Sequence, residues 1–463
     1  MRWRAAVFVM GAALLAISYS GRWRVGRDSA LYRAVAHSLA TGEGYRFRGE
    51  PETLIHPGYP LLLAGLERRF GAGDPMRPRG PLLVMTAMAA CTLLVIHGLV
   101  RARHPPRLAA LVTGLCALNP TFLLAATELR PDLPFLCATC LVLYAVEIAP
   151  GAMGARRIAV AAAVLVLGLL AAWSMRPTFW FLAAALAFEG ALMIRTAADR
   201  RAGMSVVLAV AAIVAVALIV HAGAGYRDVA LAKLSDPSSL RWHHQLGALL
   251  EDRLPRAVLG FGGPPVLAAI VSMLLIAAAL SSGTRLWTFY AGITLAGTVL
   301  LGANPRYYLA ILPFILAGGI RLAERGGTRI LAVVLVLVAV PNAIATTRLV
   351  LEQRGAAPVD EEFAPFVAMA PVLARHTAPT DKILAAEPRI LTFLADRRVH
   401  GALELGEGGE PPAGALGRLG FTHVVLCADP GCDRSLRRLV DDSGLAATPI
   451  AATAGLELYR LSR

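Results

Sequence analysis

The 463-residue chain is 57% hydrophobic and only 16% charged, whereas soluble domains carry about 25% charged residues. This composition excludes an ordinary soluble domain. The net charge of +14 would suggest a nucleic-acid partner in a soluble protein, but basic residues that flank membrane spans and set their orientation explain it better. We therefore predict a polytopic membrane protein that does not bind nucleic acid.

The first apolar run, residues 5–20, follows the basic start Met1-Arg2-Trp3-Arg4. We interpret it as an uncleaved span, because Ser18-Tyr19-Ser20 is a poor cleavage site and the run leads into an organised loop. Further apolar runs follow at 81–100, 108–127, 134–149, 158–175, 178–194, 204–221, 264–281, 286–303, 307–320 and 330–346. Judged against a hydrocarbon core of ~30 Å, these runs predict a bundle of about eleven transmembrane helices.

Two long connections, residues 21–80 and 222–262, interrupt the series of runs. Within the first, the apolar stretch 59–67 is too short to span, and we interpret it as an interfacial or re-entrant helix. If the N-terminus lies inside, the short inner connections are rich in arginine, whereas the short outer ones hold one arginine each: Arg130, Arg176 and Arg306. This asymmetry is the positive-inside pattern. Both long connections are also rich in arginine, but long segments count little in that rule.

Residues 350–463 differ from the rest, because proline, glycine and charged residues become frequent and no span-length run remains. An odd number of spans places this tail outside. Asp360-Glu361-Glu362 predicts a helix start, and residues 382–386, 424–427 and 456–461 predict short strands. We therefore divide the chain into a membrane bundle, residues 1–349, and a small extracytoplasmic α/β domain, residues 350–463. In an extracytoplasmic tail, Cys427 and Cys432 are spaced for a local disulfide.

The predicted topology places five charged residues at outer ends of spans: Asp28, Glu128, Asp132, Arg176 and Arg306. Charged residues at the centre of a span cost about 2.5–3.5 kcal/mol on insertion scales, so boundary positions are expected for structural reasons alone. Acids and arginines beside an apolar bundle also suit a phosphate-bearing lipid, because the guanidinium fork matches phosphate oxygens. The residues by themselves leave both interpretations open.

The order of these motifs resembles the GT-C superfamily of membrane glycosyltransferases, specifically the bacterial branch similar to protein O-mannosyltransferases and lipid A aminoarabinose transferases. The resemblance covers essentially the whole chain. The matching motifs are Arg27-Asp28 with Tyr32, Gly42-Glu43-Gly44-Tyr45, His56-Pro57-Gly58-Tyr59-Pro60, Glu128 with Asp132, Arg176-Pro177, and Asn304-Pro305-Arg306-Tyr307-Tyr308. The resemblance implies an inverting enzyme of the bacterial inner membrane. Such an enzyme moves a sugar from a polyprenyl-phosphate donor to an acceptor glycan, lipid or protein at the outer face.

The resemblance also implies roles for individual residues. Asp28 is the expected catalytic base, and the expected donor- or substrate-binding residues are Arg27, His56, Tyr59, Glu128, Asp132, Arg176, Arg306 and Tyr308. Some relatives have two adjacent acids in the first loop, whereas here Ser29 follows Asp28. Relatives often have a basic residue that contacts the donor phosphate before the proline-rich turn; here that residue is His56, which is charged only part of the time near neutral pH. We expect no cofactor beyond the donor itself, although Glu128 or Asp132 is also a candidate ligand for a divalent metal.

The sequence leaves two other functions open. A transporter or flippase of lipid-linked sugars would often show inverted repeats and midplane charges, and the sequence shows no evident repeat. A structural or assembly subunit with a soluble recognition tail is the third hypothesis. It predicts that the acids of the bundle tolerate substitution.

Overall fold

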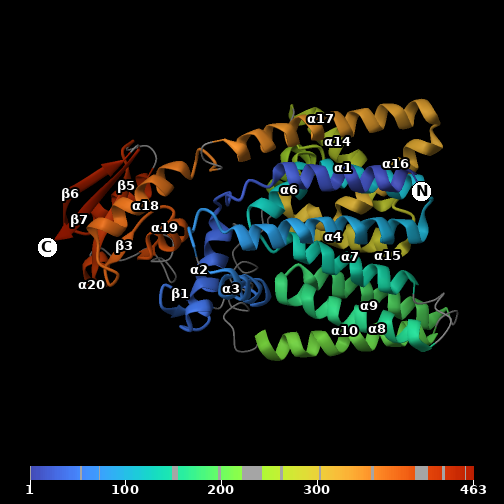
Figure 1. Cartoon of the computed structure of the whole chain (residues 1–463), viewed down its shortest axis with the longest axis horizontal. Helices are drawn as coiled ribbons and strands as arrows, with labels where there is room; N and C mark the ends of the chain where they lie inside the picture. Colours follow the sequence, from blue (N-terminus) through green and yellow to red (C-terminus); the bar gives the residue numbers. More distant parts are fainter. Residues whose placement is uncertain are drawn as a thin grey trace. The chain divides into compact units, whose positions relative to one another are not determined.

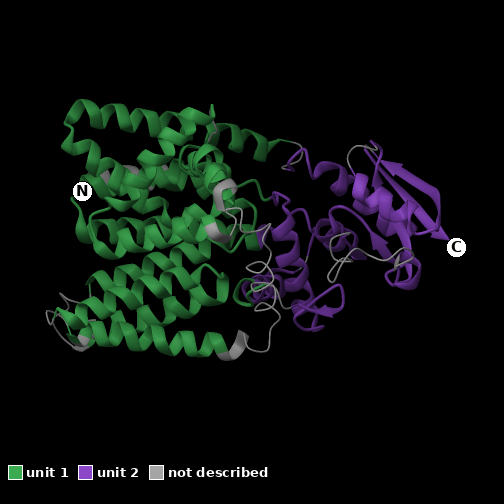
Figure 2. Cartoon of the chain, turned by 180° about the vertical axis from the view of Figure 1, so that it is seen from behind, with its two compact units in different colours: residues 1–21, 53–59, 81–355 green, residues 22–52, 60–80, 356–463 purple. Residues whose placement is uncertain are grey.

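The computed structural model describes residues 2–52, 55–71, 73–148, 155–196, 200–221, 242–260, 264–301, 304–355, 359–401, 415–429, 433–453 and 455–462. The chain forms two compact units (Figure 2). Unit 1 comprises Met1–Gly21, Thr53–Tyr59 and Pro81–Gly355, and unit 2 comprises Arg22–Glu52, Pro60–Gly80 and Ala356–Arg463. Unit 2 thus joins two pieces of the first long connection to the C-terminal residues.

Unit 1 is helical in the part that the structure describes. Its α-helices are α1 (Arg2–Ser18), α4 (Arg79–Arg103), α5 (Pro106–Leu118), α6 (Pro120–Thr127), α7 (Asp132–Ile148), α8 (Ala155–Met175), α9 (Phe179–Arg195), α10 (Arg200–His221), α12 (Trp242–Ala248), α13 (Leu254–Leu259), α14 (Pro265–Leu280), α15 (Arg285–Leu301), α16 (Leu312–Arg325) and α17 (Thr328–Arg354). A π-helix, η2 (Leu249–Arg253), precedes α13, and a 3-10 helix, η3 (Pro305–Ile311), leads into α16. In Figure 1 the long helices of this unit run roughly parallel.

Three of the described helical segments are long and apolar enough to cross a membrane: Arg79–Arg103, Pro305–Arg325 and Thr328–Arg354. A fourth span results if α5 and α6, which meet at a bend of 56°, are taken together. The chain is therefore a membrane protein. The count of eleven spans stays a prediction, since α8, α10 and α14 contain shorter apolar stretches.

The apolar run 108–127 is two helices instead of the single predicted one. Pro120 lacks an amide proton and disfavours a helical conformation of the residue before it, so α5 ends at Leu118 and Asn119 is extended. The Asn119 side chain then caps α6 by accepting a hydrogen bond from the amide of Phe122 at 3.1 Å. Local chemistry at two adjacent residues thus bends the segment.

Unit 2 contains a five-stranded sheet in the order β4-β3-β5-β7-β6. Its strands are β3 (Lys382–Leu384), β4 (Arg398–His400), β5 (Phe421–Cys427), β6 (Ala446–Thr453) and β7 (Leu456–Ser462). The pairs β3–β4 and β3–β5 are parallel, whereas β5–β7 and β6–β7 are antiparallel. The three strands predicted in the tail are present, and β4 and β6 were not predicted. Cys427 is disulfide-bonded, and its predicted partner Cys432 lies outside the described residues.

The helices of unit 2 are α2 (Arg27–Thr41), α18 (Ala364–His376), α19 (Pro388–Ala395), α20 (Ala415–Arg418) and α21 (Arg434–Asp441), with most of α3 (Gly58–Phe70). A two-stranded ribbon of β1 (Arg46–Phe47) and β2 (Glu50–Pro51) follows α2. The helix start predicted at Asp360-Glu361-Glu362 was wrong, because α18 begins at Ala364 after a turn in which the Phe363 amide donates to the Asp360 carbonyl. α2 packs against α19, so the first loop and the sheet region share one core.

The apolar stretch 59–67 lies within α3, a helix of 13 residues, which agrees with a segment too short to span. The second predicted loop, residues 222–262, lies partly outside the described residues. Its described part comprises α12, η2 and α13, and α13 ends at Gly260 with φ +77°.

Candidate functional site

The turn between α6 and α7 holds two predicted site acids in unit 1. Glu128 caps the C-terminus of α6 and Asp132 begins α7. Leu129 has a φ of +53°, a left-handed conformation that is rare for a branched residue and marks a tight turn. Both acids are buried, at 4% and 3% exposure. The tight turn thus places two buried carboxylates within one short connection.

Each of these acids pairs with an arginine. Glu128 pairs with Arg130, two residues away, and Asp132 pairs with Arg176, which directly follows α8. Arg176 is itself buried, at 7% exposure. A buried carboxylate needs such a partner, because leaving one member of a buried pair alone costs about 3–5 kcal/mol. The structure therefore joins two predicted site residues, Asp132 and Arg176, that are 44 positions apart.

The ring of Tyr307 lies beside both Arg176 and Arg306. The guanidinium carbons are 4.6 Å and 5.4 Å from the ring centroid, distances at which cation–π attraction operates. Asn304 begins η3, and its side chain accepts a hydrogen bond from the Arg306 amide at 3.2 Å. The sequence identified the motif but selected Tyr308, whose ring is fully buried. In the tight 3-10 turn, Tyr307 makes the contact with the arginines.

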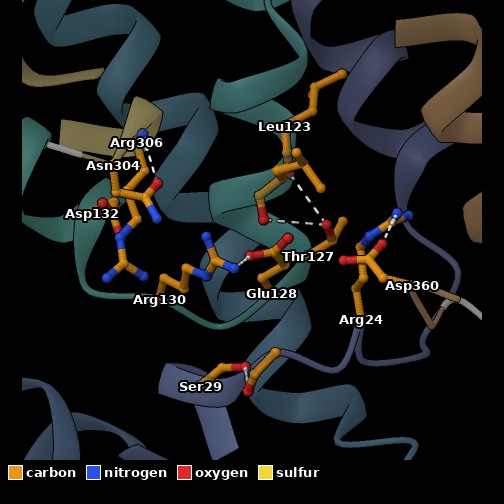
Figure 3. Close-up of polar contacts among 12 residues, drawn as sticks. Arg24, Ser29, Leu123, Thr127, Glu128, Arg130, Asp132, Asn304, Arg306 and Asp360 are labelled. Carbon is orange, nitrogen blue, oxygen red and sulfur yellow. Dashed lines mark hydrogen bonds and ion pairs between the residues drawn. The ribbon is translucent and has the colours of Figure 1, made fainter. Parts of the chain in front are cut away.

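A cavity of about 270 Å³ lies at this end of unit 1. Its charged and polar lining residues are Thr121, Arg130, Asp132, Arg256, Asn304 and Arg306, with an apolar wall from α6 and η3. Figure 3 shows Arg130 reaching Glu128 on one side of the turn and Asp132 close to Asn304 and Arg306 on the other. Arg130 and Arg256 are paired with Glu128 and Asp252, and Arg306 adds a third guanidinium group to the lining. Because a guanidinium group has five N–H donors, these arginines can still donate hydrogen bonds to an anion in the cavity.

Gly260 sets one wall of this cavity. Its φ is +77°, and a Cβ atom there would approach Pro120 Cγ to 2.7 Å. Glycine therefore satisfies both the backbone conformation and the close approach of α13 to α6. Neither Gly260 nor Arg256 was among the predicted site residues, because their sequence context on a long loop gives no such signal.

His56 and Gly58 pack on the end of α8, close in sequence to Arg176. The His56 ring contacts the Trp173 carbonyl through Nδ1 at 2.7 Å, and both His56 and Tyr59 are buried. A Cβ atom at Gly58 would lie 2.3 Å from Ser174 Oγ, so only glycine fits. The predicted His-Pro-Gly-Tyr turn thus holds the segment that carries Arg176. Neither ring lines the cavity.

Asp28 and Arg27 lie in the first turn of α2, in unit 2. Asp28 Oδ1 accepts a hydrogen bond from Arg389 Nη1 at 2.9 Å, and about a quarter of its side chain is exposed. Arg27 pairs with Glu362 and Glu387. Burial raises the pKa of Glu387, and the hydrogen bond from Arg27 opposes that rise. The partners lie 335 to 361 positions away along the chain, so residue spacing could not predict them.

Among the described residues, no three side chains of His, Cys, Asp or Glu are grouped so that they could hold a metal ion. The candidate metal ligands Glu128 and Asp132 each face an arginine. A guanidinium and a divalent cation compete for the same carboxylate oxygens, so this arrangement does not suit a metal.

No family model matches the chain, and no curated protein matches it. Solved structures match in fold. ArnT from Cupriavidus metallidurans bound to undecaprenyl phosphate has a TM-score of 0.60 at 14% identity, covering 99% of this chain and 98% of that chain. AglB, an oligosaccharyltransferase from Archaeoglobus fulgidus in complex with an inhibitory peptide and a dolichol-phosphate, has a TM-score of 0.60 at 12% identity, covering 99% and 74%. The arabinofuranosyltransferase AftD from Mycobacteria has a TM-score of 0.51 at 16% identity, covering 100% and 42%. The chain has the fold of the GT-C membrane glycosyltransferases, as the resemblance of its motifs implied.

Proposed function

We propose that this protein is an inverting glycosyltransferase that uses a polyprenyl-phosphate sugar as donor. The acceptor is a hydroxyl or phosphate of a glycan, lipid or protein at the outer face of the bacterial inner membrane. The observation that carries the proposal is the cavity lined by Arg130, Arg256 and Arg306 in a protein of this fold. ArnT binds undecaprenyl phosphate and AglB binds dolichol-phosphate in the structures that share the fold.

The chemistry follows from the donor. A phosphate-linked sugar is already activated, because phosphate is a competent leaving group. Arginines near the departing phosphate would stabilise the negative charge that develops on it, and we assign this role to Arg176 and Arg306. The ion pair between Arg176 and Asp132, together with the Tyr307 ring, holds the guanidinium in place before the donor arrives.

The acceptor hydroxyl must lose a proton as it attacks the anomeric carbon. A positioned carboxylate typically accelerates such a step by about 10²–10⁴-fold, and we assign this role to Asp28. Direct attack by the acceptor inverts the anomeric carbon, so no covalent sugar–enzyme intermediate forms. His56 is proposed to act through position, since its ring is buried against α8. Tyr59 is assigned the same role because its side chain is fully buried.

The proposed topology has about eleven spans, with the N-terminus inside and the C-terminal residues outside. In it, residues 1–349 form the membrane bundle and residues 350–463 form the extracytoplasmic α/β domain. The connections that hold Glu128, Asp132, Arg176 and Arg306 then face the outside.

The proposal is tested on the purified protein in lipid, incubated with a panel of radiolabelled polyprenyl-phosphate sugars and a membrane extract as the source of acceptors. We expect release of free polyprenyl phosphate from one donor, and loss of that release in Asp28→Asn. Glu50→Gln is the matched control, because Glu50 is an exposed acid of the same unit. Movement of the lipid-linked sugar across vesicles without cleavage would instead establish a flippase.

A further inference from the structure

A second cavity, of about 620 Å³, lies at the other end of α7. Glu147, near the C-terminus of α7, lines it, whereas Asp132 begins the same helix. At 1.5 Å per residue, these two positions are about 22 Å apart along the helix axis. The second cavity is therefore separate from the one that the proposed transfer reaction uses.

The charged side chains that line this second cavity carry a net positive charge. Arg103 pairs with Glu147, and Arg285 Nη2 donates a hydrogen bond to Glu189 Oε1 at 3.3 Å. Arg321, on α16, also lines the cavity, and it forms no ion pair with an acidic side chain among the described residues. Two arginines are thus neutralised, and a third contributes a net positive charge.

The backbone at the start of α15 adds to this positive field. Gly283, Thr284, Arg285 and Leu286 all line the cavity, so the first turn of a 17-residue helix faces it. The N-terminus of a helix carries about half a positive charge and amide protons without partners in the helix. At α15 the Trp287 amide already donates to Thr284 Oγ1 at 3.1 Å, so the amides before it are the ones that a ligand could use. Gly283 has a φ of +104°, and a Cβ atom there would lie 2.2 Å from Arg321 Nη1. The glycine thus lets Arg321 lie directly on the loop that begins α15.

The cavity also holds an acceptor that requires a donor. Glu189 Oε2 is buried and has no hydrogen-bond partner among the described residues, although Oε1 is bound by Arg285. A buried carboxylate oxygen without a donor is costly. A ligand that supplies an O–H or N–H group at this position would remove that cost.

We propose that this cavity binds a phosphate-bearing group that also carries a hydroxyl or ammonium donor. The phosphate accepts hydrogen bonds from Arg321 and from backbone amides at the N-terminus of α15. The hydroxyl or ammonium group of the ligand donates a hydrogen bond to Glu189. Phosphoethanolamine has this chemistry, either as a phospholipid headgroup or as a free soluble compound. The cavity volume falls within the range of ordinary small-molecule sites, about 300–1,000 Å³.

The test uses the full chain purified in a nonionic detergent. Phosphoethanolamine and phosphocholine are titrated by calorimetry, and binding of phosphatidylethanolamine and phosphatidylcholine is followed by native mass spectrometry. We expect the ethanolamine form to bind about tenfold or more tightly than the choline form, because choline has no N–H group for Glu189. Binding of the soluble compound identifies a free ligand, and binding of the lipid alone identifies a headgroup.

Two variants and a matched control make the test specific. Arg321→Gln is expected to weaken phosphate binding about tenfold or more, and Arg321→Lys, which keeps the charge, to weaken it less. Arg325→Gln is the control, because Arg325 is exposed one turn further along the same helix. Glu189→Gln is expected to remove the preference for ethanolamine and retain choline binding. The proposal is overturned if no phosphate compound binds, or if Arg321→Gln binds as well as the wild type.

Discussion

The Asp28 carboxylate accepts a hydrogen bond from Arg389 at 2.9 Å, so a substitution at Asp28 removes an ion pair as well as the proposed base. Because both side chains are partly exposed, the pair contributes little to stability. The two effects can therefore be separated by removing the arginine and keeping the acid. Glu362 and Glu387, which pair with Arg27 beside it, remain in that variant.

We predict that Arg389→Gln retains transfer activity within about threefold of the wild type, whereas Asp28→Asn loses about 10²–10⁴-fold, the usual contribution of a general base. The measurement is initial-rate release of polyprenyl phosphate at saturating donor. Melting temperatures of both variants show whether unit 2 remains folded. Equal loss in the two variants would mean that Asp28 acts only as the partner of Arg389.

At the scale of elements, the bend between α5 and α6 is held by two buried asparagines. Asn119 Nδ2 donates to the Ala257 and Val258 carbonyls at 2.9 and 3.1 Å and to Asn342 Oδ1 at 3.1 Å. Asn342, on α17, donates in turn to the Val258 carbonyl at 3.0 Å. Three helices, α6, α13 and α17, therefore meet through side-chain amides within an apolar bundle. α13 ends at Gly260, which lines the arginine-rich cavity.

We predict that Asn342→Leu destabilises unit 1 by about 1–3 kcal/mol, because it removes two buried hydrogen bonds, from Asn119 Nδ2 to Asn342 Oδ1 and from Asn342 Nδ2 to the Val258 carbonyl, each worth about 0.5–1.5 kcal/mol. Val340→Leu, at an exposed position two residues earlier on α17, is the matched control and is expected to change little. Thermal unfolding of both variants in the same detergent measures the difference. Equal melting temperatures would show that the bend does not depend on this contact.

A second prediction at this scale concerns the contact between α2 and α3. His37 Nδ1 and Glu67 Oε1 form a hydrogen bond in unit 2, and this bond raises the pKa of His37. A raised folded-state pKa gives stability that is fully present below the unfolded value of about 6.5 and is lost as the pH rises through the folded value. Wild type should therefore exceed His37→Gln in melting temperature at pH 6, and the difference should vanish by pH 9. A difference that does not change with pH would contradict this.

The helices and strands also show which features could be predicted from the sequence and which could not. The sequence was enough to place Glu128 and Asp132 at one connection and to predict β3, β5 and β7. β6 was missed because its sequence, with Pro449 and four alanines, carries little strand signal. The partners of Asp132 and Asp28 lie 44 and 361 positions away, so only the packed structure brings them together. Tyr307 was passed over for Tyr308 because the 3-10 turn rotates successive side chains differently from an α-helix.

At the scale of the whole molecule, the distribution of arginines bears on the membrane orientation of the chain more than on its fold. Within the membrane bundle, the short connections that the sequence assigns to the inside carry more arginines than the short connections assigned to the outside. The second cavity, with Arg103, Arg285 and Arg321, lies at the helix ends that this assignment places inside. The first cavity lies at the opposite ends, where the donor phosphate is proposed to bind. One orientation of the chain thus determines which compartment supplies the ligand of each cavity.

The orientation is tested with single cysteines and a membrane-impermeant thiol reagent on intact cells. Glu361→Cys should be labelled without permeabilisation, because an odd number of spans places the C-terminal residues outside. Arg325→Cys should be labelled only after permeabilisation, because it lies between the last two predicted spans. Both positions are exposed in the structure, so access depends on the membrane and not on folding, and the parent chain controls for the native cysteines. Labelling of both positions from outside, or of neither, would contradict the predicted orientation and with it the assignment of Arg176 and Arg306 to the outer face.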